Sequence, residues 1–361
     1  MNCDVAVVGN GPAGCAAAKH AAEKNDVLIV GGGERKVQCA GLISKTGMES
    51  IGVRPRDFVL AKIRGARIHS PGGVTIEVDG GDIKAYVVDR LGFDQHMLEQ
   101  AEDAGAKYTE DWATSLRGKI KLKSGKTVNA KKTILATGSN LSLQIEAGLD
   151  RPREFLIGGQ YEMKAECEGD LVELYFTVPD FFAWVIPFED KARIGLCVKT
   201  NPRPYLDAFV KRLKDEKRIR SDRILAETFG IIPIHNPATK TQFGDIATVG
   251  DAAGQVKAST GGGVIFGAIA AEYATRPDYE MLWRKRIGND LRLHLFIHRT
   301  LNRLTDKGKD RLFRIISETH TCLEKSGDMD WAGRTLQGVL RNPGFLAKTA
   351  VNLPMLLADM R

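Results

Sequence analysis

One glycine-rich turn, Gly9–Gly14 with the sequence GNGPAG, constrains the fold of this chain most strongly. It follows an apolar run at 3–9, which is typical of a buried parallel strand, and precedes an alanine-rich helical stretch at 13–23. Its glycines allow a tight turn, close approach of the backbone to a diphosphate, and close packing of helix on strand. The helix start offers free N–H groups and a positive dipole end to phosphate. The turn therefore predicts a dinucleotide-binding βαβ unit.

The second strand of this unit, at 27–30, lacks the acidic residue that normally follows it. A dinucleotide-binding unit places an Asp or Glu about 20 residues after the glycines, where it binds a ribose hydroxyl. This chain instead has Gly31, Gly32 and Gly33, followed by Glu34. Glu34 either reaches back to the ribose or is an exposed loop charge, and both interpretations stay open. This position does not decide between a nicotinamide and a flavin dinucleotide.

A second glycine-rich segment favours a flavin. The sequence VGDAAG at 249–254 places Asp251 after a late strand, where its carboxylate can accept a hydrogen bond from a ribityl hydroxyl. The next segment, STGGGV at 259–264, begins a helix and offers backbone N–H groups to the pyrimidine end of an isoalloxazine ring. The alternative is that Asp251 only caps the helix at 252–270. An ATG turn at 136–138 is typical of the point where a flavoprotein chain crosses beneath the nucleotide.

The order of the other patterns predicts an α/β (α+β) fold with intertwined domains. Segments that alternate around glycine turns at 65–81 and 119–132 are typical of hairpins, and the alternation between 155 and 200 predicts an antiparallel sheet. The end of the chain favours helices, broken near Pro343 and Pro354. We therefore expect a Rossmann-like FAD-binding domain at 1–65, 85–145 and 240–275, an antiparallel-sheet substrate domain at 66–84 and 146–239, and a C-terminal helical region at 276–361.

Composition excludes several other classes of protein. No uncharged apolar run reaches the ~18 residues of a membrane span. The six cysteines form no CxxC pair and no zinc-like cluster, so we expect no metal site. Scattered cysteines without a targeting segment favour a cytoplasmic location. The net charge of +7 favours an anionic partner, but the basic stretch at 284–314 lacks the interleaved aromatics of a nucleic-acid-binding module, so we expect no nucleic acid.

Several of these motifs together resemble a known family. The Gly9–Gly14 turn, the segment 88–106 with Arg90, the ATG turn and GDAAG resemble FAD-dependent oxidoreductases with the para-hydroxybenzoate hydroxylase type fold. Within them, QCAGL at 38–42 and FFAWVIP at 181–187 are similar to the geranylgeranyl reductase family (digeranylgeranylglycerophospholipid reductase-like). That family carries a Cys-Gly-Gly-like segment near the flavin and a Tyr/Phe-x-Trp-x-Phe-Pro motif. The resemblance spans residues 3–275, with departures at Gly31 for the acid, Ala40 for a glycine and Ile186 for a phenylalanine.

The resemblance and the patterns above assign residues to an FAD site and to a substrate site. The residues expected to contact FAD are Gly9, Gly11, Pro12, Ala13, Gly14, Glu34, Cys39, Ala40, Leu42, Arg90, Ala113, Gly138, Asp251, Gly261, Gly262, Gly263 and Val264. The residues that the resemblance implies for a prenyl pocket are Phe182, Trp184, Ile186 and Pro187.

Two of these assignments have a simpler alternative. Alternation along a strand places Phe182, Trp184 and Ile186 on one side, where they form either a broad apolar wall beside the flavin or ordinary core packing. Cys39 is either a catalytic thiol that protonates or shapes the substrate site, or an inert packed cysteine.

The function that the resemblance implies is reduction of isolated C=C bonds in the polyprenyl (geranylgeranyl) chains of isoprenoid lipids or their precursors. Reduced FAD would give a hydride to one alkene carbon while the site excludes water. No second G-x-G-x-x-G pattern is present, so we expect an external electron donor, either NAD(P)H or ferredoxin. Basic residues at the pocket mouth would hold a phosphate headgroup, and the C-terminal helices would either contact an anionic membrane surface peripherally or pack as a lid.

Two other functions stay open. One is an FAD-dependent monooxygenase or halogenase that acts on a polar aromatic, although Phe182 replaces the first tryptophan of the WxWxIP stretch that halogenases usually carry. The other is a flavin electron carrier that serves a quinone.

Overall fold

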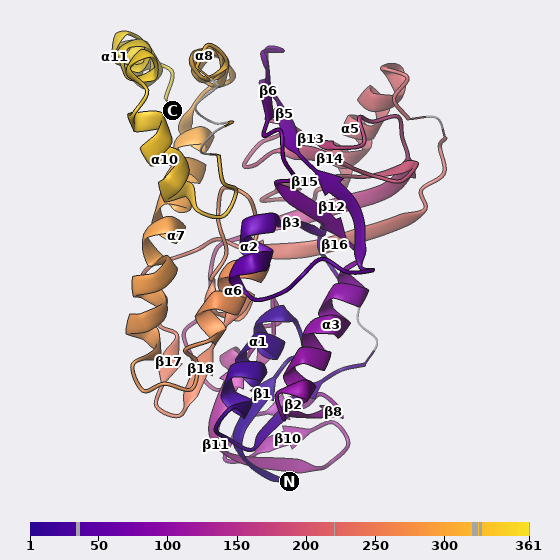
Figure 1. Cartoon of the computed structure of the whole chain (residues 1–361), viewed down its shortest axis with the longest axis vertical. Helices are drawn as coiled ribbons and strands as arrows, with labels where there is room; N and C mark the ends of the chain where they lie inside the picture. Colours follow the sequence, from indigo (N-terminus) through magenta and orange to yellow (C-terminus); the bar gives the residue numbers. More distant parts are fainter. Residues whose placement is uncertain (34–36, 220, 320–323, 325–326, 361) are drawn as a thin grey trace.

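The computed structural model describes residues 1–33, 37–219, 221–319, 324 and 327–360. Figure 1 shows a first half built around β1 at one end, a second sheet at the other end, and C-terminal helices along one side. The mixed α/β architecture confirms the predicted fold class. Glu34 lies outside the described residues.

The first sheet contains the predicted βαβ unit. β1 pairs in parallel with both β2 and β11, in the strand order β17-β18-β11-β1-β2-β8. β9 and β10 extend it through an antiparallel β10–β11 pair, as the alternation at 119–132 predicts. The bounds are β1 (Asn2–Val8), β2 (Val27–Gly31), β8 (Lys107–Glu110), β9 (Ala113–Ser115), β10 (Ile120–Leu122), β11 (Thr127–Leu135), β17 (Gln242–Phe243) and β18 (Ile246–Thr248).

Small side chains let helices pack closely against this sheet and against one another. The alanines of α1 and α6 are buried in one core cluster. The longer α3 is capped by Asp89, whose carboxylate accepts hydrogen bonds from the backbone N–H groups of Leu91 and Gly92. The bounds are α1 (Pro12–Ala22), α2 (Lys45–Ser50), α3 (Arg90–Asp103), α4 (Ser142–Glu146), the 3₁₀ helix η1 (Gly250–Ala253) and α6 (Val264–Ala271).

The second sheet has seven strands in the order β16-β12-β15-β14-β13-β5-β6. Its pairs are antiparallel, as the alternation predicts, except that β5 joins β13 in parallel. One face packs on α5 (Arg203–Asp215), and the other carries Phe182, Trp184 and Ile186 on one side, as expected. The bounds are β5 (Gly65–His69), β6 (Thr75–Asp79), β12 (Phe155–Lys164), β13 (Leu171–Tyr175), β14 (Ala183–Phe188), β15 (Lys191–Val198) and β16 (Ala226–Pro233).

A small third sheet, which the sequence patterns did not predict, has the order β3-β7-β4. It carries the segment after Cys39 and contacts both of the larger halves: β7 leads into α3, and β4 and β7 lie next to β14. The bounds are β3 (Leu42–Ser44), β4 (Val59–Ile63) and β7 (Ala85–Val88).

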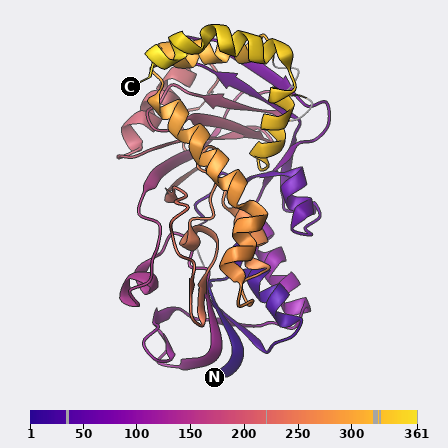
Figure 2. The same ribbon diagram turned by 90° about the vertical axis from the view of Figure 1, so that its left-hand side faces the viewer.

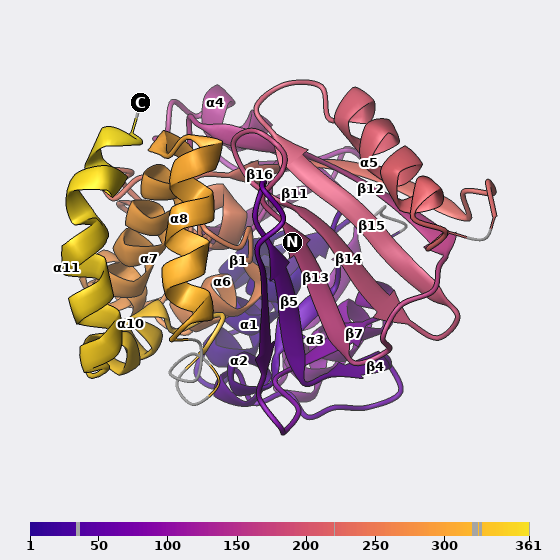
Figure 3. The same cartoon turned by 90° about the horizontal axis from the view of Figure 1, so that it is seen from above.

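The C-terminal region is helical, as predicted. Figure 2 shows the long helix α7 running from the half around β1 to the second sheet, where α11 lies across its end. Seen from above, α8, α10 and α11 lie on one side of the second sheet and α5 lies on the other (Figure 3). The bounds are α7 (Tyr279–Arg303), α8 (Asp306–Ser317), α10 (Ala332–Leu340) and α11 (Pro343–Ala358).

The expected helix break at Pro354 is wrong, because α11 continues through this proline. Proline removes one backbone N–H donor and leaves the carbonyl four residues earlier without its partner. That carbonyl belongs to Ala350, which is exposed, so water can replace the lost donor. No helix in the described part of the chain combines the length and apolarity needed to cross a bilayer.

Candidate functional site

The glycines of the 9–14 turn are required by close packing. Gly9 has a φ of 112°, and a Cβ there would overlap the carbonyl oxygen of Ala136. A Cβ at Gly14 would overlap the carbonyl oxygen of Gly9. The N-cap residue of α1, Gly11, provides no side-chain cap, and Pro12 follows it. Among the described residues, no side chain caps the first-turn N–H groups of α1, which are thus available to an anionic ligand beside the ATG turn, whose Gly138 has a φ of 61°.

Two further glycine positions bring the 249–264 segment onto the start of α1. A Cβ at Gly250 would lie 2.9 Å from the Cβ of Ala13, so α1 and η1 meet here. A Cβ at Gly263 would overlap Oδ1 of Asp251, which places this carboxylate against the start of α6. Gly263 is the N-cap of α6 and Val264 its first residue, again without a side-chain cap. Two uncapped helix starts and one carboxylate therefore lie together.

The carboxylate of Asp251 has no hydrogen-bond donor among the described residues, although it is only partly exposed. Burial raises its pKa, and the nearby Arg90 opposes that shift. A carboxylate left without a donor in such a position fits a ligand hydroxyl. The hydroxyl of Thr137, in the neighbouring ATG turn, is also buried without a partner in the described structure.

Arg90 links this carboxylate to Cys39. Its guanidinium donates to Asp94, with Nε 2.9 Å from Oδ1 and Nη2 3.1 Å from Oδ2. Burial alone lowers the pKa of Arg90, but the sulfur of Cys39, which hydrogen-bonds to it, and the Asp94 carboxylate raise it overall. The structure therefore brings together three residues that the sequence places far apart: Cys39, Arg90 and Asp251.

Arg193 of β15 holds the Cys39 segment in place, and the sequence patterns did not single it out. Its Nη1 donates to the carbonyl oxygens of Ala40 and Val88 at 2.9 and 3.0 Å. A Cβ at Gly41 would overlap this same Nη1. The one available signal was a cation within the otherwise apolar segment ARIGLCV.

A small cavity of about 10 Å³ lies beside the loop between η1 and α6. Of the predicted substrate residues, Phe182 lines it, and Trp184 and Ile186 are buried in the same hydrophobic cluster as Phe182. Pro187 is also buried, but alternation along β14 turns it toward the opposite face of the sheet. The indole of Trp184 donates to Oε1 of Gln160 at 3.1 Å. Ala40 and Leu42 pack against this cluster. The lining residues are Phe176, Phe181, Phe182, Ser259, His298, Leu301, Asn302 and Lys309.

The cavity borders the glycine loop that was predicted to contact the flavin. A Cβ at Gly261 would lie 3.6 Å from Cζ of Phe181, and one at Gly262 would lie 2.9 Å from Nζ of Lys257. Ser259 lies 2.5 Å from Nδ1 of His294 through its hydroxyl. His294 Nε2 donates to the carbonyl oxygen of Asp330 at 3.0 Å, and burial lowers the pKa of His294 to about 4. The imidazole is therefore neutral at pH 7 and accepts the serine proton at Nδ1.

The last predicted contact, Ala113, begins β9 at the edge of the first sheet. Residues of the cavity that the sequence analysis missed are Phe176, Phe181, Ser259, His298, Leu301, Asn302 and Lys309. No group of three or more His, Cys, Asp and Glu side chains in the described ranges is arranged to hold a metal ion.

Comparison with known proteins adds family evidence to this geometry. The chain is 31% identical over 365 residues to digeranylgeranylglycerophospholipid reductase 2 of Methanothermobacter thermautotrophicus, which covers 87% of this chain and 91% of that protein. It is also 31% identical to digeranylgeranylglycerophospholipid reductase of Methanosarcina acetivorans, over 87% of this chain and 88% of the relative. The chain belongs to the digeranylgeranylglycerophospholipid reductase family.

Family and fold comparisons agree with this membership. The profile of the pyridine nucleotide-disulphide oxidoreductase family matches residues 3–164. A geranylgeranyl bacteriochlorophyll reductase-like protein from Thermoplasma acidophilum has the same fold, with a TM-score of 0.82 at 22% identity over 97% of this chain and 99% of its own. The flavin-dependent brominase Bmp2 shares the fold more distantly, with a TM-score of 0.64 at 15% identity over 98% and 99%.

These comparisons support an FAD cofactor for this member of the reductase family. The residues present fit the cofactor in three respects. The start of α1 is uncapped beside the glycine turn, the Asp251 carboxylate lacks a donor in the described structure, and the glycines at 9, 14 and 263 leave no room for a side chain.

Proposed function

We propose that this chain is an FAD-dependent reductase that saturates C=C double bonds in polyprenyl, specifically geranylgeranyl, chains of isoprenoid lipids or their precursors. One observation carries the proposal. The cavity lined by Phe176, Phe181 and Phe182 borders Ser259 and the glycine loop before α6, so an apolar chain would lie directly beside the cofactor. The names of the relatives support the same substrate class.

The proposed cofactor contacts follow from the site geometry. The backbone of Gly9, Gly11, Ala13 and Gly14 would hold the diphosphate, and Asp251 would accept from a ribityl hydroxyl. The loop residues Gly261, Gly262 and Gly263 with Val264 would face the pyrimidine end of the ring. The segment with Cys39, Ala40 and Leu42 would lie along the ring.

FAD, when bound and reduced, supplies the hydride for one alkene carbon. The chain must exclude water, hold the double bond in place, and supply one proton to the other alkene carbon. The phenylalanines that line the cavity exclude water, because their rings are in mutual contact. The ring centroids of Phe181 and Phe182 lie 4.1 Å apart, and the two rings stack. We assign the proton to the thiol of Cys39, because the neighbouring Arg90 would balance the negative charge left on its sulfur. Cys39→Ala should retain FAD and lose turnover, whereas normal turnover would remove Cys39 from the mechanism.

The cavity has a polar end that suits an anionic headgroup. Lys309 is only 9% exposed, and its nearest acid, Asp306, lies 3.7 Å from Nζ. His298 hydrogen-bonds Asn302, and burial lowers the pKa of His298, so Lys309 carries the positive charge here at neutral pH. We infer that Lys309 pairs with the phosphate of the lipid. Lys309→Met should raise the KM for a phosphorylated prenyl substrate more than that for the corresponding alcohol, and equal effects would contradict this assignment.

The electron donor is proposed to be NAD(P)H or ferredoxin. Anaerobic mixing with each donor, monitored by the loss of flavin absorbance, distinguishes them. Bleaching by neither donor, in a protein that dithionite does reduce, would exclude both.

A peripheral contact with an anionic membrane surface would give the enzyme access to lipid. Helix α11 exposes apolar side chains, including Val351 at 74% and Leu357 at 58%. This helix packs on α8, whose Phe313 lies 5.1 Å from Phe176 in the cavity lining, measured between ring centroids. Flotation with vesicles that contain anionic lipid should show salt-sensitive binding, reduced in the double variant V351S/L357S. The absence of binding by the wild-type protein would contradict the membrane contact.

The decisive experiment is mass spectrometry of prenyl lipids incubated with dithionite-reduced protein. We expect products heavier by steps of two hydrogens, and loss of these products in Asp251→Ala. Unchanged lipid together with oxygen-dependent turnover of an aromatic would instead indicate a monooxygenase or halogenase. Unchanged lipid with rapid electron exchange to a quinone would indicate an electron carrier.

A further inference from the structure

Side chains from two other segments, the glycine-rich turn and the end of β8, fill the space beside Gly31, Gly32 and Gly33. A Cβ at Gly31 would lie 2.7 Å from the Cβ of Asn10, and one at Gly32 would overlap the indole of Trp112. A Cβ at Gly33 would overlap Oε1 of Glu110. The three glycines therefore leave room for side chains that approach them from other segments of the chain.

The strand register explains why a residue of β8 reaches this place. β2 and β8 are parallel, and Gly31 lies opposite Glu110 in the pairing. The carboxyl ends of parallel strands meet at the same edge of a sheet, which is where open α/β folds bind their ligands. Glu110 thus stands at the edge position where the acid that would follow β2 is missing.

The backbone at this edge is held firmly. The hydroxyl of Tyr108 donates to the carbonyl oxygen of Gly31 at 3.1 Å, and Nδ2 of Asn10 donates to that of Gly32 at 3.3 Å. The Asn10 bond joins the glycine-rich turn to the residue after β2, and the Tyr108 bond joins β8 to the last residue of β2. The distance between the diphosphate turn and Glu110 is therefore set by the fold.

Glu110 and Trp112 are both available to a ligand. The Glu110 carboxylate is exposed and takes part in no hydrogen bond or ion pair in the described parts of the chain. Trp112 is 50% exposed, a large apolar area for a single residue at a strand end. An unpaired carboxylate suits a pair of ribose hydroxyls, and an exposed indole suits the flat face of a base.

We propose that Glu110 of β8, in place of an acid after β2, accepts hydrogen bonds from the ribose hydroxyls at the adenosine end of FAD, and that Trp112 packs against the adenine. This inference rests on FAD as the cofactor and is independent of the prenyl substrate. It also explains how the chain can bind the ribose without an acid after β2, because the neighbouring strand β8 supplies a carboxylate and the glycines leave room for it.

The test compares ligands that have and lack the adenosine end. Apoprotein is titrated with FAD and with FMN, and binding is followed by flavin fluorescence and by calorimetry. Glu110→Gln should weaken FAD binding by about tenfold or more, the usual worth of a hydrogen bond to a charged group, and leave FMN binding unchanged. Trp112→Ala should act in the same selective way, and Glu102→Gln on the exposed side of α3 is the matched control.

A second titration isolates the ribose hydroxyls. ADP and 2′,3′-dideoxy-ADP share the diphosphate and adenine, so the wild-type protein should prefer ADP by about tenfold, and Glu110→Gln should bind the two equally. The proposal is overturned if FAD and FMN affinities fall by the same factor, if neither affinity changes, or if the selective loss occurs in Glu34→Gln instead. Wild-type protein that takes up no FAD would also overturn it, whereas inactivity toward lipid would not affect it.

Discussion

Lys257 and Asp330 form an ion pair that is almost completely removed from solvent, with side chains 3% and 1% exposed. The second carboxylate oxygen of Asp330 accepts from the hydroxyl of Ser44, and Lys257 also donates to the carbonyl oxygen of Met329 at 3.2 Å. The pair joins the segment before α10 to the loop that leads into α6. The C-terminal region is thus anchored directly beneath the proposed flavin-binding loop.

Removal of one member of this pair should destabilise the protein strongly. Lys257→Met leaves the Asp330 carboxylate buried without its counter-charge, which costs about 3–5 kcal/mol of unfolding free energy. Urea unfolding followed by circular dichroism measures the change. The control is Lys107→Met, which breaks an exposed, solvent-screened pair with Asp26 and should change the free energy of unfolding far less. Equal effects of the two substitutions would contradict the interpretation.

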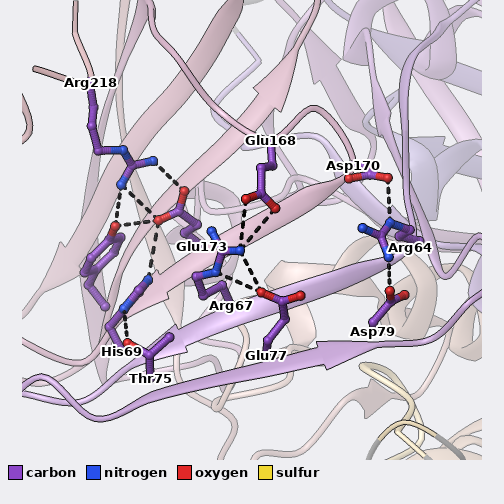
Figure 4. Close-up of polar contacts among 11 residues, drawn as sticks. Arg64, Arg67, His69, Thr75, Glu77, Asp79, Glu168, Asp170, Glu173 and Arg218 are labelled. Carbon is purple, nitrogen blue, oxygen red and sulfur yellow. Dashed lines mark hydrogen bonds and ion pairs between the residues drawn. The ribbon is translucent and has the colours of Figure 1, made fainter.

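Glu173 should make stability depend on pH in the acid range. Burial alone would raise its pKa, but His69, whose Nε2 lies 3.4 Å from Oε2, and hydrogen bonds from Tyr175 and Arg218 lower the pKa of Glu173 from 4.5 to about 2 (Figure 4). The unfolded chain therefore binds the proton more readily than the folded one. The contribution, about 3 kcal/mol, is complete above pH 4.5 and is lost as the pH falls towards 2.

The test is urea unfolding at a series of pH values. Glu173→Gln should be less stable at neutral pH and should flatten the profile between pH 4.5 and 2. Glu77→Gln, at a carboxylate 45% exposed that pairs with Arg67 in a separate group on the same sheet, should keep the wild-type profile. A wild-type slope in Glu173→Gln would assign the pH dependence to another group.

Arg193 should control the order of the Cys39 segment. Arg193→Met leaves the carbonyl oxygens of Ala40 and Val88 without their donor, at a cost of about 1–3 kcal/mol for each unsatisfied buried group. We expect folded protein that retains less FAD per chain after gel filtration, with partial recovery in Arg193→Lys. Lys191→Met, a less buried cation on the same strand, should retain the full flavin content. Unchanged retention in Arg193→Met would show that the segment does not need this anchor.

Asp251→Asn should affect stability and cofactor binding in opposite directions. Burial raises the pKa of Asp251 above its ordinary value of 3.8, so at pH 7 the ionised group destabilises the apoprotein, and a neutral amide should stabilise it by about 1 kcal/mol. This gain should disappear as the pH falls below the ordinary value, where the unfolded chain is also protonated. FAD affinity should fall by about tenfold, because the amide is a weaker acceptor. Thermal unfolding without FAD and titration with FAD measure the two effects, and a less stable apoprotein would contradict the first.

Features that depend only on residues close together in the sequence were predicted from it. The turn at Gly9–Gly14, the alternation that puts Trp184 and Ile186 on one side of β14, and the glycine-rich start of α6 follow from local spacing and local conformational preference. These patterns also carried the resemblance to the reductase family. Helix continuation through Pro354 was not predicted, because it depends on solvent reaching one freed carbonyl.

Features that depend on contacts between distant segments came only from the tertiary structure. The register of β2 on β8 decides that Glu110 stands beside Gly33, and the approach of β15 to the third sheet decides that Arg193 holds Ala40. The cavity beside Ser259 exists because α7 and α8 close over the segment 176–182, which precedes β14. Sequence periodicity specifies which face of a helix or strand is buried. Strand pairing and helix packing specify which residues contact that face, and a functional site consists of such contacts between distant segments.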